Sequence, residues 1–398
     1  MSDVPQMGPG QNPFGFDLSE LMRLLQSPGP VNMEVARRTA EAMAGVDPET
    51  GDPRPEPSTT TGDRSALEGA IGAVRLPVAE TTGITAALTL PARITDRRDW
   101  ATTTVAGLEP VLGALAGALG RPPTAEPGEP TPTPDALFGA LLQGLVPLLL
   151  GGWAGSMIGN LAHRTLGRYD LPLPLTGEPE IGLVAANVAA FATEWDLPAD
   201  EVRYAVALRE TTRAAIRSTA WVRDHLVALA SAFVGAYEVG AGAIEEQFRN
   251  LDLGDPEAMA SLEAFADPEQ LLGAMRSPRQ EPLLADLRRF TAILEGYADL
   301  VAEHIGSAVM TTHARTDEAV KRHRVDRGDA GRFVDRLLGL ELRRDDYEAG
   351  IAFCRGVVER GDGSFDDLNR LWESVRLAPT AAELEAPGLW LARIELPD

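Results

Sequence analysis

The heptapeptide Leu208-Arg209-Glu210-Thr211-Thr212-Arg213-Ala214 carries the strongest structural signal in this chain of 398 residues. It lies within residues 197–218, whose apolar side chains recur at the spacing of an α-helix. The inward positions follow one another at intervals of four, three, four and three: Val202, Val206, Arg209, Arg213 and Ile216. Because both arginines share the face of the apolar residues, we expect them to point into the protein.

The same two arginines stand where a zinc-binding helix would carry its ligands. In the H-E-x-x-H signature, two histidines one helical turn apart bind Zn²⁺, and the glutamate between them takes a proton from the metal-bound water. Here the glutamate is present as Glu210, but both histidine positions hold arginine. A guanidinium group stays protonated and has no lone pair for a cation. The sequence therefore predicts no zinc binding through this motif.

The surrounding sequence gives the motif its meaning, because R-E-x-x-R by itself is common on helices. Other characteristic segments flank it in order along the chain: Tyr169-Asp170-Leu171-Pro172-Leu173-Pro174, Trp195-Asp196-Leu197-Pro198, Trp221-Val222-Arg223-Asp224-His225-Leu226 and Leu294-Glu295-Gly296-Tyr297-Ala298-Asp299. Together they resemble an actinobacterial family of zincin-like metalloproteases, which are hydrolases. The resemblance covers most of the chain and is weakest over residues 47–63 and 121–134.

The resemblance implies a former role for each position of the motif. Relatives that look active carry H-E-x-x-H on the corresponding helix and an acidic third ligand on a later helix. Carried over to this chain, the two ligand positions are Arg209 and Arg213, and the general-base position is Glu210. The third-ligand position is Glu295, and Asp299 lies one turn beyond it as a supporting acid.

Two inward cations need acidic partners, because burying an unpaired charge is costly. The central hypothesis is that Arg209 and Arg213 take the place of the metal. Their charges would then hold Glu210, Glu295 and Asp299 in a salt-bridge network, with no metal and no other cofactor. The alternative is a rotated helix whose arginines reach solvent along their stems.

A relocated metal site is a further alternative. His225 and His304 could join Glu295 and Glu210, since a histidine with carboxylates and water suits zinc or another divalent ion. The spacing argues against it, because His225 lies about three helical turns beyond Arg213.

Composition narrows the range of partners. Fifty-nine acidic residues against 36 lysines and arginines give a net charge of -23. Nucleic acids and anionic lipid surfaces require a basic surface, so neither is an expected partner. The single cysteine, Cys354, excludes an internal disulfide and a cysteine-based metal cluster. The resemblance implies that the partner would be a peptide or protein, held in the cleft that active relatives use for substrate.

Cellular location is predicted from two segments. Residues 1–15 have no basic region and no apolar run of a signal peptide, so a cytoplasmic location is expected. Residues 136–162 are uncharged and long enough to span a membrane. Pro147, Gln143 and Asn160, together with the lack of a flanking basic cluster, favour a buried core helix or hairpin instead.

The helical period dominates the rest of the chain, so the predicted fold class is mainly α, a multi-helix zincin-like domain with a few short strands. Residues 1–62 are predicted to form an N-terminal arm of short helices and a Pro-rich linker, and residues 63–398 the helical domain. Helices are expected over 17–25, 32–44, 64–80, 100–119, 137–166, 197–218, 222–248, 256–265, 281–305, 329–338 and 345–360. Strands are expected over 84–90, 181–184 and 390–394, and a surface loop over 122–134.

Two function classes follow from these observations. In the favoured one, the chain is a pseudo-peptidase, a catalytically degenerate family member that acts by binding or regulation. In the other, it is a hydrolase in which Glu210 is still a general base and the metal is held elsewhere or is absent. The first is favoured because a carboxylate alone cannot replace the Lewis acid.

Overall fold

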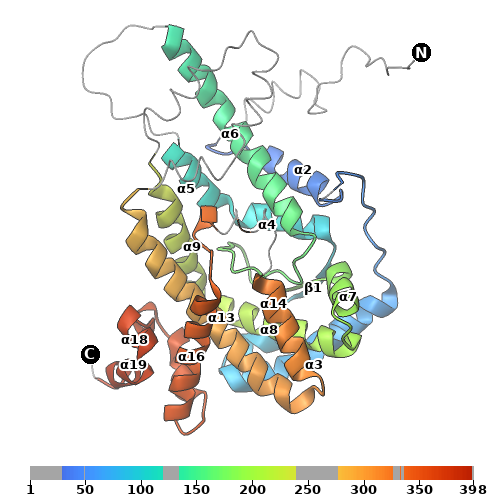
Figure 1. The fold of residues 1–398 in the computed structure, drawn as a ribbon, viewed down its shortest axis with the longest axis vertical. Coiled ribbons are helices and arrows are strands. Elements are labelled where there is room, and N and C mark those ends of the chain that lie inside the picture. The colour runs from blue at the N-terminus through green and yellow to red at the C-terminus, as the bar shows by residue number, and fades with distance from the viewer. Residues whose placement is uncertain are drawn as a thin grey trace.

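The computed structural model describes residues 29–48, 50–119, 134–238, 277–325, 332 and 336–396, and of residues 134–146 only the backbone. The prediction of a mainly α fold is confirmed (Figure 1). In the described part, the sheet consists of two short parallel strands, β1 (Ala92–Thr95) and β2 (Ile181–Val184), paired from Ala92 with Ile181 to Thr95 with Val184. The predicted helices over 17–25 and 256–265, the loop over 122–134 and most of the helix over 329–338 lie outside the described residues.

Helix α8 (Ala199–Ser218) is the centre of the fold. Every residue from Ala205 to Arg217 is buried, so the helix is enclosed on all sides rather than along one stripe. Acidic residues in its first turn and Arg217 in its last turn complement the helix dipole. The helices that pack against it are α3 (Thr61–Thr82), α7 (Ala185–Glu194), α9 (Ala220–Gly235), α13 (Gln280–Val309) and α14 (His313–Val325).

The remaining helices lie at the two ends of the molecule (Figure 1). Helix α16 packs along α13, and the short C-terminal helices pack against α16. At the other end, α2 packs on α6 and α4, and α5 packs on α9. Their bounds are α2 (Met33–Met43), α4 (Arg97–Gly107), α5 (Glu109–Leu119), α6 (Pro134–Leu161), α16 (Arg344–Arg360), α17 (Asp366–Asn369), α18 (Ala381–Glu385) and α19 (Pro387–Ile394), with 3-10 turns at Thr85–Leu88, Arg370–Trp372 and Val375–Leu377.

Two of the three predicted strands are wrong, whereas the strand over 181–184 is confirmed. Residues 84–90 form a 3-10 turn, and the first strand begins later, at Ala92. Residues 390–394 belong to α19, where Pro387 at the first helical position starts a helix because its fixed φ suits that place. A short apolar run is compatible with either a strand or a helix. In this chain the residues that flank each run determined which of the two formed.

The predicted helices differ from the observed ones in their ends, in one break and in two omissions. The helix predicted over 222–248 ends at Gly235 as α9, and the helix predicted over 137–166 ends at Leu161 as α6. The helix expected over 100–119 is broken at Leu108, because Pro110 cannot donate to the carbonyl four residues earlier. Helices α7 and α14 were not predicted. The sequence of α14 is rich in charged residues and shows a weak apolar stripe, so its helical period was missed.

The residues that lead into helix α14 are held against the start of α8 by one carboxylate. Glu201, in the first turn of α8, accepts hydrogen bonds from the backbone N–H groups and hydroxyls of Thr311 and Thr312. The hydroxyl bond from Thr311 is the largest of the effects that lower the pKa of Glu201 to about 2. This contact fixes where α14 begins, and therefore which of its side chains face α8.

The uncharged segment of α6 packs against α2 through glycines. A Cβ added at Gly155 would lie 2.3 Å from the carbonyl oxygen of Ala36, and one at Gly151 would lie 2.4 Å from that of Asn32. Part of the predicted N-terminal arm therefore packs on the helical domain, while the boundary near residue 62 stays a prediction. Over the described residues, no single helix has both the length and the hydropathy to cross a membrane, although α4 and α5 meet these criteria as a pair bent by 56°.

The close approach of α2 and α6 predicts a position-specific effect of adding one methyl group. Gly155→Ala should lower the free energy of unfolding by about 1–3 kcal/mol, because the new carbon overlaps backbone that cannot move aside. Gly152→Ala on the same helix meets Val35 only at 3.9 Å. It should be neutral or stabilise by up to about 1 kcal/mol. Urea denaturation of both variants measures the difference, and equal effects would contradict the packing described.

Candidate functional site

The arginines at positions 209 and 213 lie inside the protein. Both side chains are less than 5% exposed, and both face α13 and α14 across the centre of the fold. The helix is therefore not rotated to bring them to solvent. The arrangement of their partners determines what the site can do.

Arg213 is paired with Glu295 of α13. Its Nη2 donates to Glu295 Oε2 at 2.7 Å, and its Nε donates to the same oxygen at 3.1 Å. Glu295 is completely buried, and Arg324 of α14 adds a contact of 3.4 Å to that oxygen. Burial disfavours the charged form of Arg213, but the carboxylates of Glu295, Asp170 and Asp299 together outweigh it and raise the pKa of Arg213.

Arg209 is shared between two acids. Its Nη2 donates to Asp317 of α14 in a short ion pair, and its Nε lies 3.7 Å from Asp299 Oδ1. Asp299 in turn accepts from Arg324 Nη2 at 2.7 Å. Burial opposes the ionisation of Asp299, but the guanidinium groups of Arg324 and Arg209 outweigh it and lower its pKa to about 2. The result is a continuous charged cluster that joins α8, α13 and α14.

Two members of this cluster, Asp317 and Arg324, were not predicted from the sequence. Both lie on α14, the charged helix that the apolar period did not reveal. A signal was present, because Thr316, Val320 and Arg324 are spaced by four residues and all are buried. Lys321 of the same helix adds an outer contact of 2.7 Å to Asp317.

Arg217 is a further buried cation that sequence reasoning missed. It lies one turn beyond Arg213, and its guanidinium stacks over the ring of Tyr169 at 4.8 Å. Its Nη1 donates to the Arg213 carbonyl at 3.4 Å, whereas its Nε and Nη2 have no hydrogen-bond partner among the described residues. Burial lowers the pKa of Arg217.

Glu210 was expected to join the salt-bridge network, but it has a different partner. Its two carboxylate oxygens accept the backbone N–H of Tyr169 at 3.0 and 3.1 Å, rather than hydrogen bonds from the neighbouring arginines. Burial, only partly offset by Arg213, raises the pKa of Glu210 to about 8. At neutral pH the side chain is therefore mainly protonated, and it cannot serve as a general base in that form.

The segment that covers Glu210 is fixed by two buried side chains. Asn187 of α7 donates to the carbonyls of Ala162 and Thr165, and the indole of Trp100 donates to the carbonyl of Gly167. A Cβ at Gly167 would lie 2.6 Å from Glu210 Oε2, so the glycine lets the backbone close directly over the carboxyl group. Glu210 is sealed from that side.

The space left beside the R-E-x-x-R motif is very small. A cavity of about 10 Å³ is lined by Asp170, Arg209, Glu210 and Arg213, with apolar side chains around them. This is about the volume that one water molecule requires. A peptide group cannot enter it, so the motif has no room for a substrate in this conformation.

The histidines do not form a relocated metal site. His225 packs edge-on against Phe290 with ring centroids 4.8 Å apart, and His304 packs against Phe365 at 5.1 Å. Across the described ranges, no three histidine, cysteine, aspartate or glutamate side chains are grouped so that they could hold a metal ion. Arg209 and Arg213 cannot contribute, because a guanidinium only donates.

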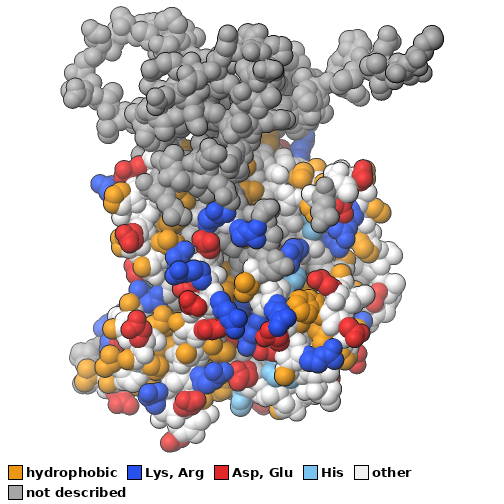
Figure 2. Space-filling view, in the orientation of Figure 1, with side chains coloured by type: hydrophobic (Ala, Val, Ile, Leu, Met, Phe, Trp, Pro, Cys, Tyr) orange, Lys and Arg blue, Asp and Glu red, His pale blue; other side chains and the backbone are white. Residues whose placement is uncertain are grey.

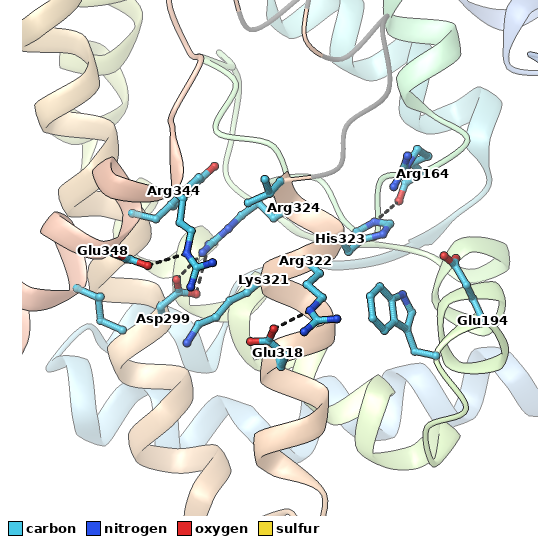
Figure 3. A pocket seen from close by; sticks show the side chains of 14 residues that line it. Arg164, Glu194, Asp299, Glu318, Lys321, Arg322, His323, Arg324, Arg344 and Glu348 are labelled. Carbon is cyan, nitrogen blue, oxygen red and sulfur yellow. Dashed lines mark hydrogen bonds and ion pairs between the residues drawn. The ribbon is translucent and has the colours of Figure 1, made fainter.

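A much larger pocket opens beside the cluster (Figure 3). Its volume is about 570 Å³, and it lies between α14, α16 and the end of α7. Asp299 and Arg324 of the buried cluster line it, together with Lys321, Arg322 and Arg344 nearer to solvent. Basic and acidic side chains are interspersed over this face of the molecule (Figure 2).

Comparison with known proteins places this geometry in a family. The sequence profile of a family described as zincin-like metallopeptidase matches residues 31–391. The chain belongs to the zincin-like metallopeptidase family. The match spans α8, α13 and α14, so the charged cluster lies within the part of the chain that this zincin-like family shares.

The zincin-like chain also resembles a solved structure. It is the crystal structure of a "putative hydrolase with a novel fold" from Chloroflexus aurantiacus, with a TM-score of 0.60 and 20% identity. The alignment covers 92% of this chain and 100% of that one. At this identity the likeness concerns the fold. No curated protein matches the chain.

Breaking the central ion pair should destabilise this zincin-like fold strongly. Arg213→Met leaves Glu295 buried without its main partner, and removal of one member of a buried pair costs about 3–5 kcal/mol. Arg213→Met/Glu295→Met removes both charges and should cost less than the two single substitutions combined. Arg322→Gln, which breaks the exposed pair with Glu318, should cost less than about 1 kcal/mol. Chemical denaturation measures the loss in the free energy of unfolding for each variant. Equal losses for Arg322→Gln and Arg213→Met would contradict the buried pairing.

The protonation of Glu210 predicts a specific pH dependence. The pKa of Glu210 is raised in the folded state from 4.5 to about 8, so its proton stabilises the fold fully below pH 4.5. That contribution is lost as the pH rises toward 8. Glu210→Gln cannot titrate, so its stability relative to the wild type should increase from pH 5 to pH 8. Denaturation at these pH values measures the free energy of unfolding of both proteins. If the difference between them did not change with pH, Glu210 would be ionised in the folded protein.

Proposed function

We propose that this chain is a catalytically degenerate member of the zincin-like family that acts by binding a peptide or protein partner. The observation that carries the proposal is the double replacement of the metal ligands. Arg209 and Arg213 flank Glu210 at the spacing of the two histidines of H-E-x-x-H. Arg209 is paired with the partly buried Asp317, and Arg213 is paired with the buried Glu295. The third-ligand position, Glu295, is committed to Arg213.

The chemistry of the donor set supports this proposal. Zinc in a peptidase polarises the substrate carbonyl and lowers the pKa of its bound water to about 7. Binding it requires lone pairs on the ligands, which histidine has and arginine lacks. The residues present therefore do not fit the metal that the family implies. Their positive charges instead neutralise Glu295 and Asp299, which lie one turn apart on the same side of α13.

The position of Glu210 supports it as well. A general base must come within about 3 Å of the proton that it removes. Glu210 is covered by Gly167 and Tyr169, and the cavity that it lines beside the motif has room for about one water molecule. An altered hydrolase that uses Glu210 would require this cover to open and a metal to be bound by other residues.

Metal content and hydrolysis test the proposal. We expect protein purified without chelators to contain no stoichiometric zinc and to leave fluorescent casein intact. Arg209→His/Arg213→His should gain about one zinc per chain, because it restores two ligands beside Glu295. Adding Glu295→Gln to that variant should reduce the zinc content again.

The result that would overturn the proposal is a wild-type chain with stoichiometric zinc, or with casein hydrolysis that a chelator abolishes. The triple substitution is the matched control, because it keeps both new histidines and changes only the acid on α13. Elemental analysis by mass spectrometry gives the zinc content directly.

A further inference from the structure

The pocket of about 570 Å³ beside the charged cluster combines three kinds of surface. Its volume lies within the range of natural ligand sites. Charged groups line it from α14 and α16, and its apolar walls include Trp195, Tyr347 and Ile351. Unlike the space beside Glu210, it is large enough for a few amino-acid residues.

Two arginines that line this pocket, Arg344 and Arg322, have unused donors among the described residues. Arg344 donates through Nε to Glu348 at 2.7 Å, and Arg322 donates through Nε to Glu318 at 2.6 Å. Lys321 contacts Asp317 at 2.7 Å. In the described part of the chain, no acceptor is assigned to the terminal nitrogens of Arg344 and Arg322. Figure 3 shows Arg344 on α16 and Lys321 on α14 extending into the pocket from separate walls.

The lining of the pocket carries an excess of basic side chains. Its arginine and lysine residues are Arg164, Lys321, Arg322, Arg324 and Arg344, and its acidic residues are Glu194, Asp299, Glu318 and Glu348. Five basic side chains therefore face four acidic ones, so a negative charge placed in the pocket is attracted.

The acids on the rim restrict what kind of anion can bind. Glu194, Glu318 and Glu348 also line the pocket, and they would repel a phosphate with two negative charges or a nucleic acid. The same carboxylates can accept N–H groups from a ligand. A ligand with one negative charge, several N–H donors and an apolar side chain matches all three surfaces.

We propose that this pocket binds the free C-terminus of a peptide. The terminal carboxylate lies between Arg344 and Lys321, where it can accept paired hydrogen bonds from the guanidinium. The peptide N–H groups face the rim glutamates, and the last side chain packs on the apolar wall. This inference rests on the proposed binding function and names the chemical class of its ligand.

Calorimetry with two matched peptides tests the inference on the wild-type chain. The probes are Ac-Gly-Ala-Leu with a free carboxylate and the same peptide as its C-terminal amide. The free acid should bind at least about tenfold more tightly, since charge-assisted hydrogen bonds contribute roughly 1.5–3 kcal/mol. Equal affinities for the two peptides, or no binding of either, would overturn the inference. So would inorganic phosphate that displaces the free acid at lower concentration.

Substitutions locate the site. Arg344→Gln and Lys321→Gln should each weaken binding of the free acid about tenfold and leave the amide unaffected. The matched control is Arg355→Gln on the same helix α16, which breaks a similar exposed pair with Glu303 of α13 without touching the pocket. An equal loss in the control, or unchanged binding in Arg344→Gln and Lys321→Gln, would overturn the assignment.

The outcomes remain distinguishable from those of the proposed function. Stoichiometric zinc or chelator-sensitive casein hydrolysis would overturn the proposal that the chain is catalytically degenerate, whether or not the peptide binds. A metal-free, inactive chain that does not discriminate between the two peptides would overturn the ligand assignment alone.

Discussion

The ion pair between Arg213 and Glu295 is the contact on which the centre of this protein depends. Both groups are buried, so neither can be solvated if the other is lost. Arg324 bridges Glu295 to Asp299, and Asp299 connects to Arg209. Three helices are thereby fixed relative to one another by charge. Apolar packing alone would not specify this registration, because it is not directional.

The same cluster has a chemical consequence. In a zincin the centre of the corresponding helix pair holds a divalent ion, whose positive charge compensates the surrounding carboxylates. Here the compensation comes from side chains that are covalently part of the chain and that only donate hydrogen bonds. We infer that the architecture has been kept while the Lewis acid has been replaced. Glu210 is enclosed under Gly167 and Tyr169, and burial raises its pKa to about 8.

The charged cluster lies between a very small cavity and a much larger pocket. The cavity next to Glu210 has room for about one water molecule, whereas the pocket reached from α14 and α16 is more than tenfold larger. Asp299 and Arg324 connect the two, since both belong to the buried cluster and both line the larger pocket. A ligand in the larger pocket would therefore act directly on the charges that hold α8, α13 and α14 together. This coupling offers a physical route from binding to a change in the core.

The sequence by itself determined the mainly α fold, the position of the central helix and the inward direction of Arg209 and Arg213. These follow from local rules, because the helical period places residues three and four apart on one face. The acids on α13 came from a resemblance, since nothing local links Glu295 to a helix more than eighty residues earlier. Asp317 and Arg324 were missed because α14 is highly charged and lacks a clear apolar stripe.

Only the tertiary structure decided how the charges pair and where the open space lies. Glu210 was expected to bind the arginines, but it accepts the N–H of Tyr169, because the segment held by Asn187 and Trp100 closes over it. Partner choice among buried charges depends on distances between helices that are far apart in sequence. Those distances are set by contacts such as that of Glu201 with Thr311. No local pattern contains them, so they emerge only when the whole chain is packed.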